Sequence, residues 1–210
     1  MSTVEETYQV FLDQIGDDNF LKPYQDACHY INHKLERINA ENSKRLGRTF
    51  IAQITYRIKT PQSCLDKLLK KNCTPDQQSV QERLGDVAGV RVVCNFLDDI
   101  YSLARILNED PELEIVKIKD YVKKPKASGY QSLHMIVAVP VSEGEKRKVE
   151  IQIRTQAMNF WAVVEHHFVY KKSKYGKNEF AKDLKECARA IYKIDKKMLL
   201  IREKMEEAQQ

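Results

Sequence analysis

A chain of 210 residues, of which 42% are hydrophobic and 31% charged, is long enough to bury a core and too apolar for intrinsic disorder. Its longest apolar stretch, residues 135–141, has only the length of a strand, which excludes a membrane-spanning helix, and the N-terminus is acidic where a secretory signal is basic. Five cysteines without a C-x-x-C spacing indicate reduced thiols in a cytoplasmic protein rather than disulfides or a zinc site.

The net charge of +5 is confined to the C-terminal part of the chain. Residues 1–170 contain 23 basic and 23 acidic side chains, whereas residues 171–210 contain 12 basic and 7 acidic ones. This surplus fits a solvated helix face, and it also fits a patch for nucleic acid or another anionic partner.

Two helices are expected before the sheet begins. Over residues 19–43, apolar side chains recur every three or four positions, which predicts one face of a long amphipathic helix. Residues 51–59 then alternate as in a strand. Thr60 and Pro61 supply an N-cap and a first helical residue, so a helix is predicted from here to about residue 71.

The middle of the chain predicts the fold class. Residues 71–81 are polar and form a loop with a short helix, whereas the β-branched run of residues 88–94 is typical of a central strand. A helix is expected next, then three strands of which the last two form a hairpin, and then another helix, over residues 98–108, 113–121, 131–139, 148–154 and 155–170. The expected fold is α+β, a mixed five-stranded sheet flanked by helices, with a long C-terminal helix.

A lysine-rich break at residues 171–177 precedes the most regular element, a helix over residues 179–208. Apolar residues at alternating spacings of three and four form a seam along it, namely Leu184, Cys187, Ile191, Ile194, Met198, Ile201 and Met205. This seam can pack on the N-terminal helix of the same chain or on another protomer. Residues 1–210 are interpreted as one domain, with N-terminal helices (1–50), a core (51–170) and a helical extension (176–210).

A first group of candidate site residues is basic. Arg57 and Lys59 share one face of a strand, and Ser63, Lys67 and Lys70 form a polar stripe on the helix that follows. Four cations and a hydroxyl near a helix N-terminus can hold a polyphosphate. An exposed basic face is the alternative.

A second group combines Asp86 with Arg91 and Glu150. Arg91 lies in an apolar strand, where it needs either a salt bridge or a ligand phosphate or base to pair with. Glu150 begins an alternating polar face that continues with Gln152 and Arg154. That face is either an ordinary polar edge, or Glu150 joins Asp86 as an oxygen ligand of Mg²⁺.

A third group follows a lysine-rich segment. Lys119 and Lys126 lead into a turn, after which Tyr130, Ser132 and His134 alternate and are expected on one face of a strand. This arrangement suits the stacking of a nucleobase while lysines hold its phosphates, with ordinary packing of the tyrosine as the alternative. Residues 165–167, Glu-His-His, are not favoured as a metal site because adjacent helical residues diverge.

The order of these motifs resembles the synthetase domain of RelA/SpoT homologues. The motifs are R-I-K, D-V-A-G-V-R, K-D-Y-x-x-x-P-K-x-x-G-Y-Q-S-L-H and V-E-I-Q-I-R-T-x-A-M-N-F-W-A-x-x-E-H. The resemblance covers about residues 22–209 and is specific, because four separate motifs occur in the right order. Without a His-Asp dipeptide or room for regulatory domains, the chain is most similar to a stand-alone small alarmone synthetase of the RelQ-like type.

The resemblance implies transfer of the β,γ-pyrophosphate of ATP to the 3′-hydroxyl of GTP or GDP, with release of AMP. Two arginines are then expected to sandwich the adenine while the other residues hold the ATP phosphates, which gives the set Arg57, Lys59, Ser63, Lys67, Lys70 and Arg91. For the acceptor nucleotide, the resemblance implies guanine stacking on the tyrosine and contacts from Lys119, Lys126, Tyr130, His134, Gln152 and Asn159.

The resemblance also implies the catalytic residues Glu150, Asp86 and Tyr130. Asp86 and Glu150 would bind Mg²⁺, with Glu150 placed to activate the 3′-hydroxyl. Bifunctional relatives carry Arg-x-Lys-Asp where this chain has lysine at position 117, which keeps the charge but not the bidentate geometry and so bears on metal and acceptor preference.

Two other functions remain open at this point. A toxic relative moves pyrophosphate to the 3′ end of tRNA, which the basic tail suits equally well, and a catalytically idle RNA-binding or nucleotide-sensing module would need no metal pair. Relatives of this type form homotetramers that bind alarmone or single-stranded RNA as regulator, so both are expected partners.

Overall fold

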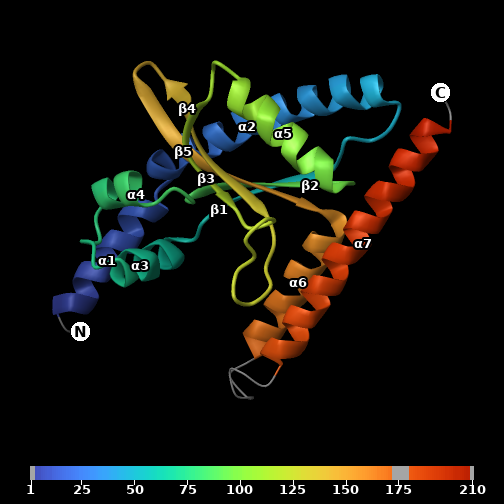
Figure 1. Ribbon diagram of the computed structural model, residues 1–210. Coiled ribbons are helices and arrows are strands. Elements are labelled where there is room, and N and C mark those ends of the chain that lie inside the picture. Colours follow the sequence, from blue (N-terminus) through green and yellow to red (C-terminus); the bar gives the residue numbers. More distant parts are fainter. Residues whose placement is uncertain (1–2, 172–179, 209–210) are drawn as a thin grey trace.

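Five strands form one mixed sheet in the computed structural model, which describes residues 3–171 and 180–208 (Figure 1). The strand order is β1-β2-β5-β4-β3, with β2 and β5 parallel and the other neighbouring pairs antiparallel. The strands are β1 Ile51–Ile58, β2 Ala88–Cys94, β3 Glu114–Asp120, β4 Leu133–Ser142 and β5 Glu145–Thr155. The predicted α+β class with a mixed five-stranded sheet is confirmed.

Helices surround this sheet, and α2 and α5 pack on its apolar face (Figure 1). The helices are α1 Thr3–Gly16, α2 Asp18–Leu46, α3 Pro61–Lys70, α4 Gln77–Arg83, α5 Leu97–Glu109, α6 Gln156–Lys171 and α7 Ala181–Glu207. In the described ranges, no helix is both long and apolar enough to cross a membrane. Residues 172–177 of the predicted lysine-rich break lie outside the described residues.

The helix ends follow from local chemistry. The side chain of Asp17 accepts a hydrogen bond from the Asn19 backbone N–H and caps α2, which ends at Gly47 in the left-handed region with φ 63°. Thr60 caps α3 in the same way, accepting from the Ser63 backbone N–H, and Pro61 is its first residue as predicted.

Strand β5 separates the core from the opposite face of the sheet. Val149, Ile151 and Ile153 are fully buried in the hydrophobic core. Because side chains alternate along a strand, Glu150 and Gln152 point to the other face. This central strand therefore has one apolar face, which belongs to the core, and one polar face, which can form part of a site.

Helix α7 packs along α6 and crosses α5, and it does so with a different face from the predicted seam. Ala188 and Asp195 are the buried positions, whereas Ile194 and Met198 of the seam are about half exposed, at 55% and 50%. Of the two alternatives for this seam, packing on the N-terminal helix of the same chain is not observed in the described residues, and packing on another protomer stays a prediction; polar contacts orient α7 instead. One of these is the ion pair of Arg202 with an aspartate of α5, at 2.9 Å.

Two contacts attach α7 to the segments that carry the polar face. The hydroxyl of Thr155, the last residue of β5, donates to the buried carboxyl group of Asp195 at 2.7 Å. Gly129, in the loop between β3 and β4, has φ +96° and lies so close to α7 that an added Cβ would stand 2.8 Å from the Cβ of Ala188. The C-terminal helix therefore supports both the end of β5 and this loop.

The buried carboxyl group of Asp195 makes the stability of the fold depend on pH. Burial raises the pKa of Asp195 to about 6, although the hydrogen bond from Thr155 acts to lower it. The unfolded value is about 3.9, so the folded state binds more protons, and stability from this group is present below pH 4 and lost towards pH 6. Asparagine does not titrate, so we expect the Asp195→Asn variant to keep its stability as the pH rises from 4 to 6.

The measurement is the free energy of unfolding in urea from pH 4 to 7 at one protein concentration. The Asp195→Asn variant should gain stability relative to the native chain as the pH rises, whereas Asp183→Asn, an exposed substitution on the same helix, should not. A pH-independent difference between the Asp195→Asn variant and the native chain would contradict the buried, proton-binding carboxyl group.

The close approach of Gly129 to α7 gives a second prediction. Gly129→Ala should cost about 1–2 kcal/mol for the left-handed backbone and about 1–3 kcal/mol more for the overlap with Ala188. Gly144 is the matched control, since its φ is +74° and nothing lies within 4 Å of an added Cβ. Urea unfolding should show a larger loss for Gly129→Ala than for Gly144→Ala, and equal losses would contradict the packing of the loop on α7.

Candidate active site

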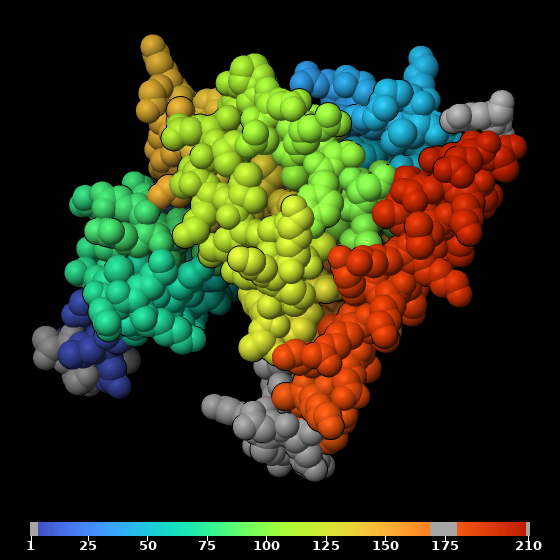
Figure 2. Space-filling view, in the orientation of Figure 1, coloured from blue at the N-terminus to red at the C-terminus, as the bar shows by residue number. Residues whose placement is uncertain are grey.

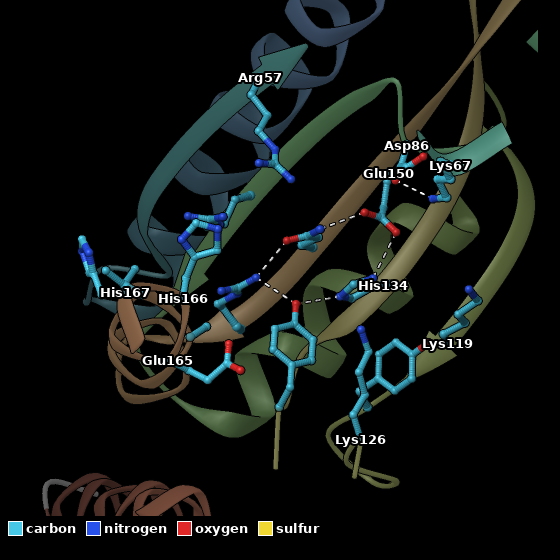
Figure 3. Close-up of a pocket in the computed structure, with 17 residues that line it drawn as sticks. Arg57, Lys67, Asp86, Lys119, Lys126, His134, Glu150, Glu165, His166 and His167 are labelled. Carbon is cyan, nitrogen blue, oxygen red and sulfur yellow. Dashed lines mark hydrogen bonds and ion pairs between the residues drawn. The ribbon is translucent and has the colours of Figure 1, made fainter. Parts of the chain in front are cut away.

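A pocket of about 550 Å³ opens on the polar face of the sheet, bounded by α3, α6 and the loop between β3 and β4 (Figure 3). Figure 2 shows a notch between the teal segment that contains α3 and the yellow segment that contains this loop. The lining residues come from all five strands or their ends, so the sheet itself brings distant parts of the sequence together.

Strand register places the polar side chains of the pocket in two adjacent rows. One row crosses four strands and contains Arg91, Gln152, His134 and Lys119 as directly paired residues. In the next row, Gly89 pairs with both Arg57 and Glu150, and it leaves space between the arginines of β1 and β2 because it has no side chain. This register follows from the hydrophobic pattern, since a slip by one residue would move these side chains into the core.

Asp86 lies at one side of the pocket beside Lys67 (Figure 3), and Lys59 is its second lysine partner. Its Oδ2 accepts hydrogen bonds from Lys67 at 2.6 Å and from Lys59 at 3.0 Å, whereas its Oδ1 is buried and has no hydrogen-bond partner within residues 3–171 and 180–208. Burial acts to raise the pKa of Asp86, but the two lysines outweigh it and the pKa is lowered. The residue is therefore a carboxylate with one oxygen free to bind a cation.

Glu150 stands at the centre of the polar face. His134 Nδ1 lies 3.1 Å from Glu150 Oε1, and Gln152 Nε2 donates to Glu150 Oε2 at 2.8 Å. Burial acts to raise the pKa of Glu150, but the hydrogen bonds from His134 and Gln152 lower it below its usual value. This group is also a carboxylate at neutral pH, and both of its oxygens are held.

Aromatic rings and a lysine form the wall next to the loop. Tyr121 and Tyr130 have their ring centroids 6.3 Å apart and lie edge-on to one another. The ammonium group of Lys126 lies 4.8 Å from the first ring centroid and 4.6 Å from the second. A flat aromatic ligand can therefore find a stacking partner and a cation at the same wall.

The lining of the pocket has an excess of positive charge. Six lysines and arginines face only three carboxylates there, namely Arg57, Lys67, Arg91, Lys119, Lys126 and Arg154 against Asp86, Glu150 and Glu165. Such an excess in a concave, partly desolvated site favours polyanions, and phosphates in particular.

The structure brings ten of the fourteen predicted site residues to this pocket: Arg57, Lys67, Asp86, Arg91, Lys119, Lys126, Tyr130, His134, Glu150 and Gln152. Lys59 reaches it only through its ion pair with Asp86. Ser63 lies in the first turn of α3 and accepts a hydrogen bond from the Thr60 hydroxyl, and Lys70 is exposed at the end of that helix.

Two predicted residues lie apart from this lining. Asn159 lines a separate depression with Gln53, Val93 and Phe160, and its contact with a nucleotide stays a prediction. Ser132 precedes β4 and does not share a face with Tyr130 and His134, because it is fully buried and its hydroxyl donates to the backbone carbonyl of residue 153.

Several lining residues were not predicted as part of the site. Arg154 follows Glu150 and Gln152 on one strand face, so the alternation of β5 already signalled its position. Tyr121 belongs to the lysine-rich segment, and residues 165–167 enter the pocket from α6 at the side opposite Asp86 (Figure 3). No local sequence pattern signals these last residues, since their place depends on how α6 docks.

Comparison with known proteins gives a consistent result. Residues 56–175 match the family model described as a region found in RelA/SpoT proteins. The chain is 37% identical over 191 residues to GTP pyrophosphokinase YwaC of Bacillus subtilis, covering 90% of this chain and 91% of that protein.

Solved structures agree with this sequence match. The structure of small alarmone synthetase 1 from Bacillus subtilis bound to its product pppGpp has a TM-score of 0.81 and 32% identity, covering 89% of this chain and 96% of that chain. The structure of the same synthetase bound to AMPCPP has a TM-score of 0.75 and 30% identity, covering 90% of this chain and 97% of that chain.

Proposed function

This chain belongs to the RelA/SpoT family, and on that premise we propose that it is a small alarmone synthetase, a GTP pyrophosphokinase. It transfers the β,γ-pyrophosphate of ATP to the 3′-hydroxyl of GTP or GDP and releases AMP. The observation that carries the proposal is a single pocket in which six cations surround the carboxylates of Asp86 and Glu150. The relatives YwaC and YjbM of Bacillus subtilis are GTP pyrophosphokinases, and the similar structure of small alarmone synthetase 1 holds pppGpp.

The donor nucleotide is assigned to the side of the pocket formed by β1, β2 and α3. Arg57 and Arg91 flank the gap above Gly89, where planar guanidinium groups can stack on both faces of an adenine. The triphosphate then extends towards Lys59 and Lys67, which already hold one carboxylate oxygen of Asp86. Ser63 and Lys70 continue the same cationic side along α3, nearer its two ends.

Mg²⁺ is the cofactor we propose for this site. The free Oδ1 of Asp86 is an orphaned buried acceptor, and Glu150 supplies a second carboxylate on the same face. One or two carboxylates plus substrate phosphates form the donor set that Mg²⁺ prefers, so the residues fit the ion. When bound, it neutralises charge on the transferred phosphates.

The acceptor nucleotide is assigned to the side formed by β3, β4 and the loop. Tyr130 offers its ring to the guanine, and Lys119, Lys126 and His134 offer positive charge or hydrogen bonds to the acceptor phosphates and ribose. Glu150 lies between the two sides, where it can accept the proton of the 3′-hydroxyl. Asn159 is left out of this proposed site because of its separate position.

The reaction needs positioning more than strong acid or base groups. Transfer between phosphates passes through a loose transition state whose charge is spread over the phosphate oxygens. Oriented cations stabilise that charge, and holding two nucleotides in line removes most of the entropic barrier. A weakly basic, well-held Glu150 is therefore compatible with catalysis.

The activity is tested with labelled ATP, GTP or GDP, and Mg²⁺. The native chain should form a 3′-pyrophosphorylated guanosine nucleotide, and Tyr130→Ala and Glu150→Gln should each reduce its rate about 100-fold or more. Glu143→Gln, an exposed substitution in the β4–β5 hairpin, should retain the native rate. Absence of product with the native chain would overturn the proposal, and label transferred to tRNA instead would favour the tRNA-modifying alternative.

We also propose that the chain forms a homotetramer through the exposed apolar face of α7. This face comprises Ile194, Met198, Ile201 and Met205, whose exposed fractions lie between 42% and 59%. Exposed apolar rows at alternating spacings of three and four residues are typical of helices that pair.

Light scattering coupled to gel filtration tests this assembly. The native chain should elute as a tetramer, whereas Ile194→Glu should shift it to smaller species, because a buried charge opposes pairing. Val10→Glu on α1 is a matched control, since Val10 is exposed to a similar extent, 56% against 55%. A native monomer, or an unchanged tetramer in the Ile194→Glu variant, would contradict the interface.

Single-stranded RNA and the alarmone product are the regulators we propose for the assembled enzyme. The charge surplus of residues 171–210, with 12 basic and 7 acidic side chains, supports an anionic regulator. A cytoplasmic location completes the proposal, because all five cysteines are free.

A further inference from the structure

Arg154 is the most deeply buried charged group of the pocket, with 2% of its surface exposed. Its guanidinium donates to the Tyr130 hydroxyl at 3.0 Å and to Gln152 Oε1 at 2.8 Å and lies over the Tyr130 ring, 5.4 Å from its centroid, whereas its Nε has no hydrogen-bond partner among the described residues. Among residues 3–171 and 180–208, it forms no ion pair with a carboxylate. Burying an unpaired cation costs free energy, so an arginine kept at this position indicates a function in the pocket.

We propose that Arg154 is a positioning residue that fixes the direction of every hydrogen bond around Glu150 and so presents its carboxylate to the acceptor hydroxyl. The proposal rests on the function proposed above, which counts Arg154 among the cations of the pocket but assigns it to neither nucleotide.

The contacts of Arg154 belong to a closed ring of five side chains (Figure 3, dashed lines). On one arm, the Tyr130 hydroxyl lies 2.9 Å from His134 Nε2, and His134 Nδ1 lies 3.1 Å from Glu150 Oε1. On the other arm, Gln152 bridges directly from Arg154 to Glu150 Oε2. Both arms therefore begin at the same guanidinium and end on the same carboxylate.

The two ends of the ring set the direction of both arms, since the Arg154 guanidinium only donates hydrogen bonds and the Glu150 carboxylate only accepts them. The atom of Gln152 that faces Arg154 is therefore the amide oxygen, and the NH₂ group faces Glu150. The Tyr130 oxygen accepts from Arg154, and we infer that its own proton is donated to His134 Nε2, because Nδ1 of that ring donates to Glu150. An imidazole that accepts at Nε2 carries its proton at Nδ1, and this proton is donated to Glu150.

The result is that each oxygen of Glu150 receives one donor. Rotation of the carboxylate is fixed from both sides, and the remaining lone pairs point into the pocket, where the acceptor hydroxyl is expected. Without Arg154, the Gln152 amide oxygen and the Tyr130 hydroxyl lose the donor that they share, so neither side chain is fixed where it supports Glu150. Alignment of the reactants is then poorer, although no group assigned to either nucleotide is removed.

A matched control lies on the same strand. Arg147 is also largely buried, with 12% of its side chain exposed, but it pairs with Glu145 and lies over the Tyr24 ring, away from the pocket. Replacing Arg147 by methionine removes an arginine from β5 without touching the ring. A loss of kcat in both Arg147→Met and Arg154→Met would indicate damage to β5 as a whole. A loss of kcat in Arg154→Met alone indicates that the ring of hydrogen bonds is disturbed.

The first readout is the tautomer of His134 in the nucleotide-free protein, measured from the ¹⁵N spectra of the imidazole rings. The chain has five histidines, and the signals of His134 are those missing from the His134→Asn variant. We expect His134 to carry a proton on Nδ1 and to accept at Nε2 in the native chain and in Arg147→Met. The Arg154→Met variant should show a mixture of tautomers, with the other four histidines unchanged.

The second readout is steady-state kinetics. Arg154→Met should lower kcat by about 10- to 100-fold while KM for ATP changes by less than about twofold, since the donor side of the pocket is intact. Arg154→Lys should recover part of kcat, because an ammonium group also only donates. Should Arg154→Met fold poorly, Arg154→Gln replaces it in both readouts, because its uncharged amide can accept as well as donate.

The proposal is overturned by an imidazolium or an Nε2–H tautomer in the native chain, or by kcat of Arg154→Met within twofold of native. It is also overturned if kcat falls while the His134 tautomer stays unchanged. These outcomes are distinguishable from failure of the proposed function, since a native chain that forms no pyrophosphorylated product would still report its His134 tautomer.

Discussion

The alternation of side chains along β5 is the constraint on which the rest of the site depends. This strand lies between β2 and β4, so its apolar residues must complete the core against α2 and α5. Its intervening residues, Glu150, Gln152 and Arg154, are then forced onto one opposite face. Burial of three aliphatic side chains thereby determines where the central carboxylate stands.

The register of the neighbouring strands places their charged side chains on the same face of the sheet. Arg91 and His134 are paired with Gln152 across the two adjacent ladders, and Lys119 extends the same row to the edge of the sheet. The cost of gathering so many cations is offset by Asp86, which binds two lysines, and by the polyphosphates we propose as substrates. The site is organised for holding and aligning charge, which is what transfer of a pyrophosphate requires.

Much of this arrangement could be predicted from the sequence, because it depends on local periodicity. The strand and helix boundaries and ten pocket residues follow from alternation, capping and motif order. The tertiary docking of helices could not be predicted in the same way. The buried face of α7 is set by Asp195 and Arg202, whose partners are 40 and 104 residues away, whereas its apolar seam suggested another face. Asn159 and residues 165–167 depend likewise on the docking of α6.

The most direct test of the account is a ³¹P NMR time course of the native chain with ATP, GTP and Mg²⁺. If the pocket aligns two nucleotides for pyrophosphate transfer, AMP and a 3′-pyrophosphorylated guanosine should accumulate in equal amounts from the first time points. Formation of ADP, or of AMP together with free pyrophosphate and unmodified GTP, would contradict the central claim.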